Sequence, residues 1–386
     1  MNSSTGSNSI SSRRRFLTGS GSGLGGLALL QMLENSAASA ATVSKNPLAA
    51  RPPHHPPKAK SVIWLFMEGG PSHLDLFDPK PALEKLSGQP MPDSFGKPIT
   101  AMGTSTNTIM PSRRQWAQHG QSGLWVSDWY PHIAKHADDL ALIRSCWADG
   151  LNHVGSVCQM NTGAIIAGRP SLGAWLTYGL GTENQNLPGF ITIKPALSHG
   201  GAKNWSSAFL PAAYQGTAVA HGGIKVDELK EPIEYLENKG LTREQQRYEL
   251  DMLQKMNHAS AERWRLNPEL EARIQAFELA FRMQTEAPEA FDIARESEAT
   301  KKLYGMGDPM SRDFGWQCLM ARRLAQRGVR FIQINHEYGP GNEVGWDAHS
   351  ELIRLHTRTA KMVDQPIAGL LKDLKAHGLL RDTLVV

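Results

Sequence analysis

Cysteine is scarce in this sequence, and long hydrophobic runs and blocks of basic residues are missing. The 386 residues include three cysteines, Cys146, Cys158 and Cys318, which form no CxxC pair. An odd and sparse set of this kind excludes a disulfide framework and a cysteine-rich metal centre. The fold must therefore rest on a hydrophobic core. A composition of 40% hydrophobic and 20% charged residues is sufficient for one.

Positive charge is low and is concentrated at the N-terminus. The formal net charge is +4, and residues 1–40 contain three arginines and one glutamate, so the rest of the chain carries +2. The weak charge of that remainder argues against nucleic acid as a partner.

The Gly- and Leu-rich stretch from Gly19 to Leu33 is too interrupted by glycine to span a membrane. We therefore expect no stable membrane span after removal of a leader.

The first 40 residues have the features of an export signal. The hexapeptide SRRRFL (12–17) resembles the twin-arginine motif, in which serine, two arginines and any residue precede phenylalanine and leucine. Ala38-Ser39-Ala40 fits a small-residue cleavage site. We expect a signal peptide over residues 1–40 and a mature protein in the periplasm or at the cell surface. Proteins that use this route fold before export, often with a metal or cofactor already bound.

The mature chain should begin with a linker and continue as an α/β domain. Residues 41–60 are rich in proline and predict an extended linker. The apolar run 62–67 does not alternate with polar residues, which is typical of a central strand covered on both faces. A short buried strand is expected at 141–144, and another at 329–335 that ends at His336.

Helical patterns complete the domain, which we assign to residues 61–386. Helices are expected at 311–327 and around 367–374, where Pro366 should lie in the first turn or kink the helix. Residues 225–300 predict a helical insertion. Strands and helices in this order indicate a mainly parallel sheet with helices on both faces. The last residues predict a strand that has only begun, so we expect a fragment whose C-terminal part is missing.

Three polar clusters follow strand-like segments. The first contains Glu68, Ser72, His73, Asp75 and Asp78; the second is Asn152-His153-Val154-Gly155-Ser156; the third contains His336, Glu337, Asp347 and His349. Because the carboxyl ends of parallel strands meet at one edge of a sheet, these side chains should converge. Carboxylates and imidazoles are ligands for divalent metals. The joint placement therefore predicts a metal site.

Each candidate also has a structural explanation. Asp78 precedes a proline and can cap a turn. Asn152 or Ser156 can cap a helix. His336 can be a buried, hydrogen-bonded histidine of the core. No single cluster is specific by itself.

Several stretches together resemble the DUF1501 family. They are FMEGGPSHLDLFDPKP, QSGLWVSDWYPHIAKHADDLALIRS, NHVGS followed by NTG, and GVRFIQI…GWDAH…GLLRDTLVV. The resemblance extends from about Lys60 to the end of the chain. It implies an exported bacterial protein, of a type abundant in planctomycetes, related to the sulfatase and alkaline-phosphatase superfamily. It also implies an alkaline-phosphatase-like α/β fold.

The resemblance implies metal ligands at Glu68, His73, Asp347 and His349. Sulfatases carry paired aspartates where this chain has Glu68-Gly69, and their Cys/Ser-x-Pro-x-Arg nucleophile motif is absent. Ser156 and His153 are the candidate catalytic residues in that neighbourhood. The final Asp and His ligands of the superfamily would lie beyond Val386.

The resulting expectation is a metal-dependent hydrolase of sulfate or phosphate esters. The metal would polarise the ester, and Ser156 or a water molecule would attack. The sequence does not distinguish zinc, calcium and magnesium as the metal, nor small-molecule esters from polysaccharide esters as the substrate. The rival is a non-catalytic exported binding or surface protein that retains the fold. A carbohydrate-processing accessory factor is a third alternative.

Overall fold

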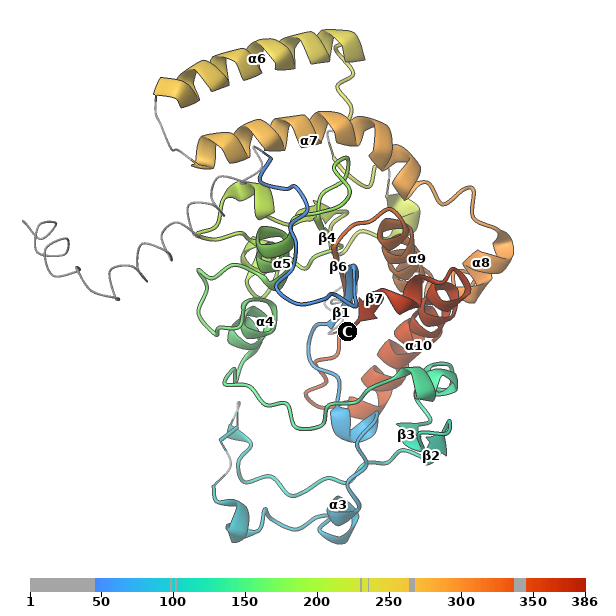
Figure 1. Ribbon diagram of the computed structural model, residues 1–386. Helices are drawn as coiled ribbons and strands as arrows, with labels where there is room; N and C mark the ends of the chain where they lie inside the picture. Colours follow the sequence, from blue (N-terminus) through green and yellow to red (C-terminus); the bar gives the residue numbers. More distant parts are fainter. Residues whose placement is uncertain are drawn as a thin grey trace, which may run out of the picture. The chain divides into compact units, whose positions relative to one another are not determined.

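Five parallel strands form the central sheet of this α/β protein (Figure 1). In the computed structural model their order is β5-β4-β6-β1-β7. The strands are β1 (Ser61–Met67), β4 (Phe190–Ile193), β5 (Thr217–Val219), β6 (Phe331–His336) and β7 (Thr383–Val385). Every pairing between them is parallel, and β1 lies between β6 and β7. The predictions of a mainly parallel sheet and of a central first strand are therefore confirmed.

The structure describes residues 46–97, 99–100, 103–229, 231–234, 236–263, 268–336 and 345–386. The chain after Pro47 forms one compact unit. The predicted signal peptide (1–40) and Glu337 lie outside the described residues. Within the described ranges, no helix is both long and apolar enough to cross a membrane.

Helices cover both faces of the sheet, as the sequence predicts (Figure 1). Helices α9 (Arg312–Gln326) and α10 (Leu352–Ala376) cover one face, and α4 (His153–Thr162) and α5 (Leu172–Leu180) cover the other. Alternate residues of β6 point to opposite faces. Ile332 belongs to the same core cluster as Leu319 of α9. Phe331 packs instead against Phe190, with ring centroids 5.2 Å apart. A Cβ on Gly173 of α5 would lie 2.6 Å from the Phe331 ring, so this helix approaches the sheet closely.

Two long helices, α6 (Arg243–Arg263) and α7 (Pro268–Phe291), lie between β5 and β6 in the chain. They meet through polar contacts: Arg247 donates hydrogen bonds to both carboxylate oxygens of Glu278, at 3.0 and 2.9 Å. Two apolar side chains of α6, Leu253 and Met256, are exposed. Three further elements are shorter: α3 (Pro81–Lys85), α8 (Glu298–Leu303), and an antiparallel hairpin of β2 (Trp116–His119) with β3 (Leu124–Ser127).

One local prediction is wrong. Residues 141–144 form no strand and are exposed, since this apolar run is short and pairs with none of the described strands. Of the two alternatives for Pro366, the first turn is excluded, because Pro366 lies well inside α10. An internal proline removes one backbone hydrogen bond, at a cost of about 3 kcal/mol. Burial of the preceding turns, which include His356 and Val363, offsets that cost.

A buried ion-pair network joins α9 to α10. The Nε of Arg322 donates to Oδ2 of Asp373 at 2.9 Å, and the hydroxyl of Tyr304 donates to the same oxygen at 2.8 Å. Arg322 also pairs with Glu296 at 2.8 Å. Arg322 and Asp373 are 3% and 6% exposed, so their charges depend on these contacts.

Candidate metal centre

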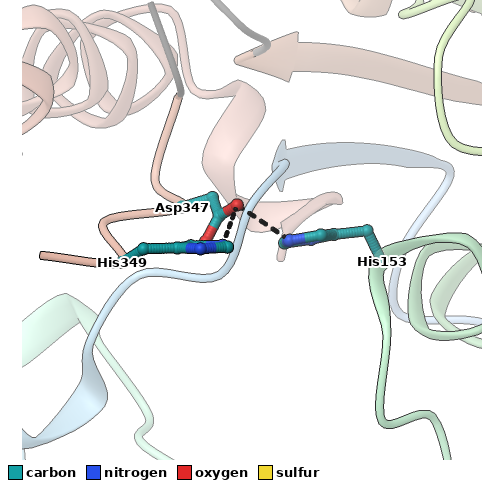
Figure 2. A group of neighbouring side chains, drawn as sticks. All are labelled: His153, Asp347 and His349. Carbon is teal, nitrogen blue, oxygen red and sulfur yellow. Dashed lines mark hydrogen bonds and ion pairs between the residues drawn. The ribbon is translucent and has the colours of Figure 1, made fainter. Parts of the chain in front are cut away.

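Asp347 binds two histidines from different parts of the chain (Figure 2). Its Oδ2 lies 2.9 Å from Nε2 of His153 and 2.7 Å from Nε2 of His349. One potential ligand atom from each residue lies within 4.8 Å of the others. His153 comes from the first turn of α4, whereas the other two belong to the segment before α10. The prediction that the second and third clusters converge is thus borne out in this group.

The first turn of α4 positions His153. The side chain of Asn152 accepts a hydrogen bond from the backbone N–H of Gly155, which makes Asn152 the N-cap of the helix. A cap of this type contributes about 1 kcal/mol and fixes where the helix begins. His153 is consequently the first helical residue, and its imidazole reaches Asp347.

The loop after β1 holds Asp347 through its backbone. Gly69 has a φ of +100°, and a Cβ there would lie 2.5 Å from the backbone nitrogen of Asp347. The backbone N–H of Trp346 donates to the carbonyl of Glu68 at 3.2 Å. Only glycine tolerates both this conformation and this close approach. The two segments therefore meet where β1 ends, at the carboxyl edge of the sheet.

A second carboxylate–imidazole pair lies beside the first. Oε1 of Glu68, a residue 2% exposed, lies 2.5 Å from Nδ1 of His199 and accepts from the Ser198 hydroxyl at 3.3 Å. The rings of His199 and His153 are 5.0 Å apart between centroids. His199 has a φ of 47°, which is uncommon for a residue with a side chain. Glu68 thus reaches the site indirectly, through a histidine that the sequence reasoning missed.

Other predicted site residues lie elsewhere. His73 is exposed at the start of a 3₁₀ turn (His73–Asp75), and it does not belong to the three-residue metal group among the described residues. Ser156 lies inside α4 and does not cap it. Its Oγ would be 2.5 Å from a Cβ on Gly150, and it makes no hydrogen bond to a described residue. Asp78 pairs with Lys80 at 2.7 Å and does not belong to the three-residue metal group among the described residues.

Two buried histidines flank Trp346, the residue before Asp347. Its ring lies 5.8 Å from His336 and 5.2 Å from His356. The Nδ1 atoms of both histidines are buried and have no hydrogen-bond partner among the described residues. Burial lowers the pKa of His336 from 6.5 to about 4, and it also lowers the pKa of His356. Both imidazoles are therefore neutral near pH 7.

His336 should make the fold sensitive to acid. Between pH 6.5 and about 4 the unfolded chain binds a proton at this residue and the folded chain does not. The free energy of unfolding should thus decrease as the pH falls through this range, by up to about 1.4 kcal/mol per pH unit. We expect His336→Phe to reduce this loss in urea unfolding at pH 7 and pH 5. His258→Phe, at an exposed position, should leave it unchanged. If the unchanged protein, His336→Phe and His258→Phe lost the same free energy of unfolding between pH 7 and pH 5, His336 would be excluded as a cause of the acid sensitivity.

The donor set fits a divalent metal. Two imidazole nitrogens and one carboxylate oxygen match the three-ligand pattern of catalytic zinc sites, in which a fourth position is left for water or substrate. His349 has a side-chain exposure of 54%, so the group is open on one side. Without a metal, the same atoms form a hydrogen-bonded His–Asp–His group.

Comparison with known proteins places the chain in one family. Residues 59–386 match the family model described as "Protein of unknown function (DUF1501)". No curated protein and no solved structure matches the chain. The matched range covers most of the sequence and includes all five residues of the two carboxylate–imidazole groups. The chain therefore belongs to the DUF1501 family.

Proposed function

We propose that this protein is a metal-dependent hydrolase of sulfate or phosphate esters. The observation that carries the proposal is the His153–Asp347–His349 group, whose ligand atoms lie within 4.8 Å of one another. Its place at the carboxyl edge of a parallel sheet supports it, because ligands of such folds bind there. We also propose that the fold is alkaline-phosphatase-like, and that the twin-arginine leader directs the protein to the periplasm or cell surface.

His153, Asp347 and His349 would hold the cation. A divalent metal bound there would polarise an ester oxygen and stabilise developing negative charge. Glu68 holds His199 by a contact of 2.5 Å, an arrangement that orients an imidazole for proton transfer. In this proposal His199 receives the proton of a water molecule that attacks the sulfur or phosphorus atom, and it returns this proton to the alcohol oxygen as the ester bond breaks. Ser156 is the weaker candidate nucleophile, because its hydroxyl lies against Gly150.

A non-catalytic binding or surface protein is the second candidate. Two observations favour it: β1 is followed by Glu68-Gly69 rather than paired aspartates, and Ser156 makes no hydrogen bond to the described residues of the cluster. In this reading the His–Asp–His group would only tie α4 to the segment before α10.

Metal analysis of the folded full-length protein separates the two candidates. We expect at least one divalent ion per chain by elemental analysis, and hydrolysis of para-nitrophenyl sulfate or phosphate that ceases after chelation and returns with added metal. Zinc, calcium and magnesium should be compared separately in the reconstitution. A folded protein that neither retains nor binds any of these ions would support the binding protein instead.

A further inference from the structure

The molecule also contains a cavity that lies apart from the two carboxylate–imidazole groups. A cavity of about 500 Å³ lies at the carboxyl end of β6, between the start of α9 and the middle of α10. These two helices cover the same face of the sheet (Figure 1). None of Glu68, His153, His199, Asp347 and His349 lines it. A volume of this size is typical of pockets for small organic molecules.

The inner end of the cavity offers an unused hydrogen-bonding atom. His336 lines the cavity and is 7% exposed, and its Nδ1 has no hydrogen-bond partner among the described residues. Its ring packs against Phe314, with centroids 5.4 Å apart. A buried polar atom that lacks a hydrogen bond destabilises the fold, and a ligand that supplies the missing hydrogen bond would recover that free energy.

This inner end is already balanced in charge. Lys194, which is 5% exposed, pairs with Asp313 at 2.6 Å, and Asp313 also accepts from the backbone N–H of Val226 at 3.0 Å. An additional buried charge would therefore lack a counter-ion there. A neutral hydroxyl group suits His336 better than an ionised group.

The rest of the lining combines apolar side chains with polar and charged ones. The apolar side chains are Ile224, Val226, Met310, Phe314, Leu355 and Met362. The lining includes four cationic and three anionic side chains, a net charge of +1. Lys225 is exposed and forms no ion pair with a described residue. This charge favours an anionic group on the ligand near Lys225.

We propose that this cavity binds a small hydroxylated organic acid. Its apolar body lies against Met310, Phe314 and Met362, its hydroxyl forms a hydrogen bond with Nδ1 of His336, and its carboxylate faces Lys225. The inference does not depend on the proposed hydrolase activity. His336 connects this cavity to the candidate metal site. Its ring contacts Trp346, and the next residue in the chain, Asp347, belongs to the metal cluster.

Calorimetric titration with para-hydroxyphenylacetate tests the proposal, in the presence of a chelator so that metal binding has no influence. We expect measurable binding to the full chain. Phenylacetate lacks the hydroxyl and tyrosol lacks the carboxylate, and each should bind about tenfold more weakly, which corresponds to roughly 1.4 kcal/mol. Absence of binding by para-hydroxyphenylacetate would overturn the proposal.

Three variants locate the binding. Met362→Trp should fill the cavity and abolish binding, and His336→Phe should remove the preference for para-hydroxyphenylacetate over phenylacetate. Lys225→Glu changes an exposed side chain and so leaves folding intact; it should remove the preference over tyrosol. Lys58→Glu makes the same charge change at an exposed position outside the cavity and should have no effect. Binding that is unchanged in Met362→Trp and Lys225→Glu would place the probe elsewhere and refute the assignment.

Discussion

Asp347→Asn should weaken divalent metal binding by more than about 100-fold and reduce ester hydrolysis to background. Oδ2 of Asp347 is the atom that both His153 and His349 contact, at 2.9 and 2.7 Å. The substitution keeps the size of the side chain but removes the negative charge that a cation requires. Loss of a partner outside the ligand set already costs roughly 10- to 100-fold in metal affinity, so loss of a central ligand should cost more.

The measurement is metal content by elemental analysis, together with a titration of the metal-free variant. Asp93→Asn is the matched control, because Asp93 is exposed and its side chain forms no hydrogen bond or ion pair with a described residue. His349→Ala provides a second variant at a side chain with 54% exposure, where folding should not be affected. If both cluster variants retained metal at the level of the Asp93 control, the site would not be the metal centre.

Asp373→Ala should lower the free energy of unfolding by about 3 to 5 kcal/mol, the usual cost of removing one partner from a buried ion pair. The change leaves Arg322 with Glu296 as its remaining anionic partner, and it leaves the hydroxyl of Tyr304 without an acceptor. Tyr304 is fully buried, so no water replaces the lost contact. Urea unfolding followed by circular dichroism measures the effect.

An exposed ion pair supplies the comparison. Glu351 pairs with Arg354, and the side chains are 54% and 62% exposed. Exposed pairs contribute at most about 1 kcal/mol, so Glu351→Ala should have a small effect on the free energy of unfolding. A loss at Asp373 no larger than the loss at Glu351 would mean that α9 and α10 are held together by their apolar contacts alone.

Long apolar patterns made the central elements predictable. The unbroken run in β1 and the amphipathic pattern of α9 both reflect burial, which acts over many residues and leaves a clear trace in the sequence. Short segments carry less information. Residues 141–144 have the composition of a strand, but they pair with none of the strands in the described part of the chain.

The candidate site was predictable only in part. Asp347, His349 and His153 follow from the rule that polar residues at strand ends converge. His199 was missed because it lies several residues beyond β4, a strand of only four residues, and reaches Glu68 through an uncommon backbone conformation. The sequence gives only a weak signal for this histidine, a short apolar stretch, FITI, that KPAL separates from SHGG. The exposure of His73 depends on the turn after Gly70, where the backbone N–H of Ser72 donates to His356, and sequence spacing does not reveal such a contact.

The position of β1 between β6 and β7 has a consequence for the timing of folding. The hydroxyl of Ser61 donates to the carbonyl of Val329, 268 positions later, and His153 meets Asp347 across 194 positions. At a synthesis rate of roughly 5 to 20 residues per second, about 15 to 50 s pass between the synthesis of β1 and that of its neighbour β6. During that time its apolar residues are exposed on the nascent chain, and contacts of such long range slow the folding that follows. Chaperones that shield β1 should therefore raise the yield of native protein, and a metal can be loaded only after Asp347 has left the ribosome.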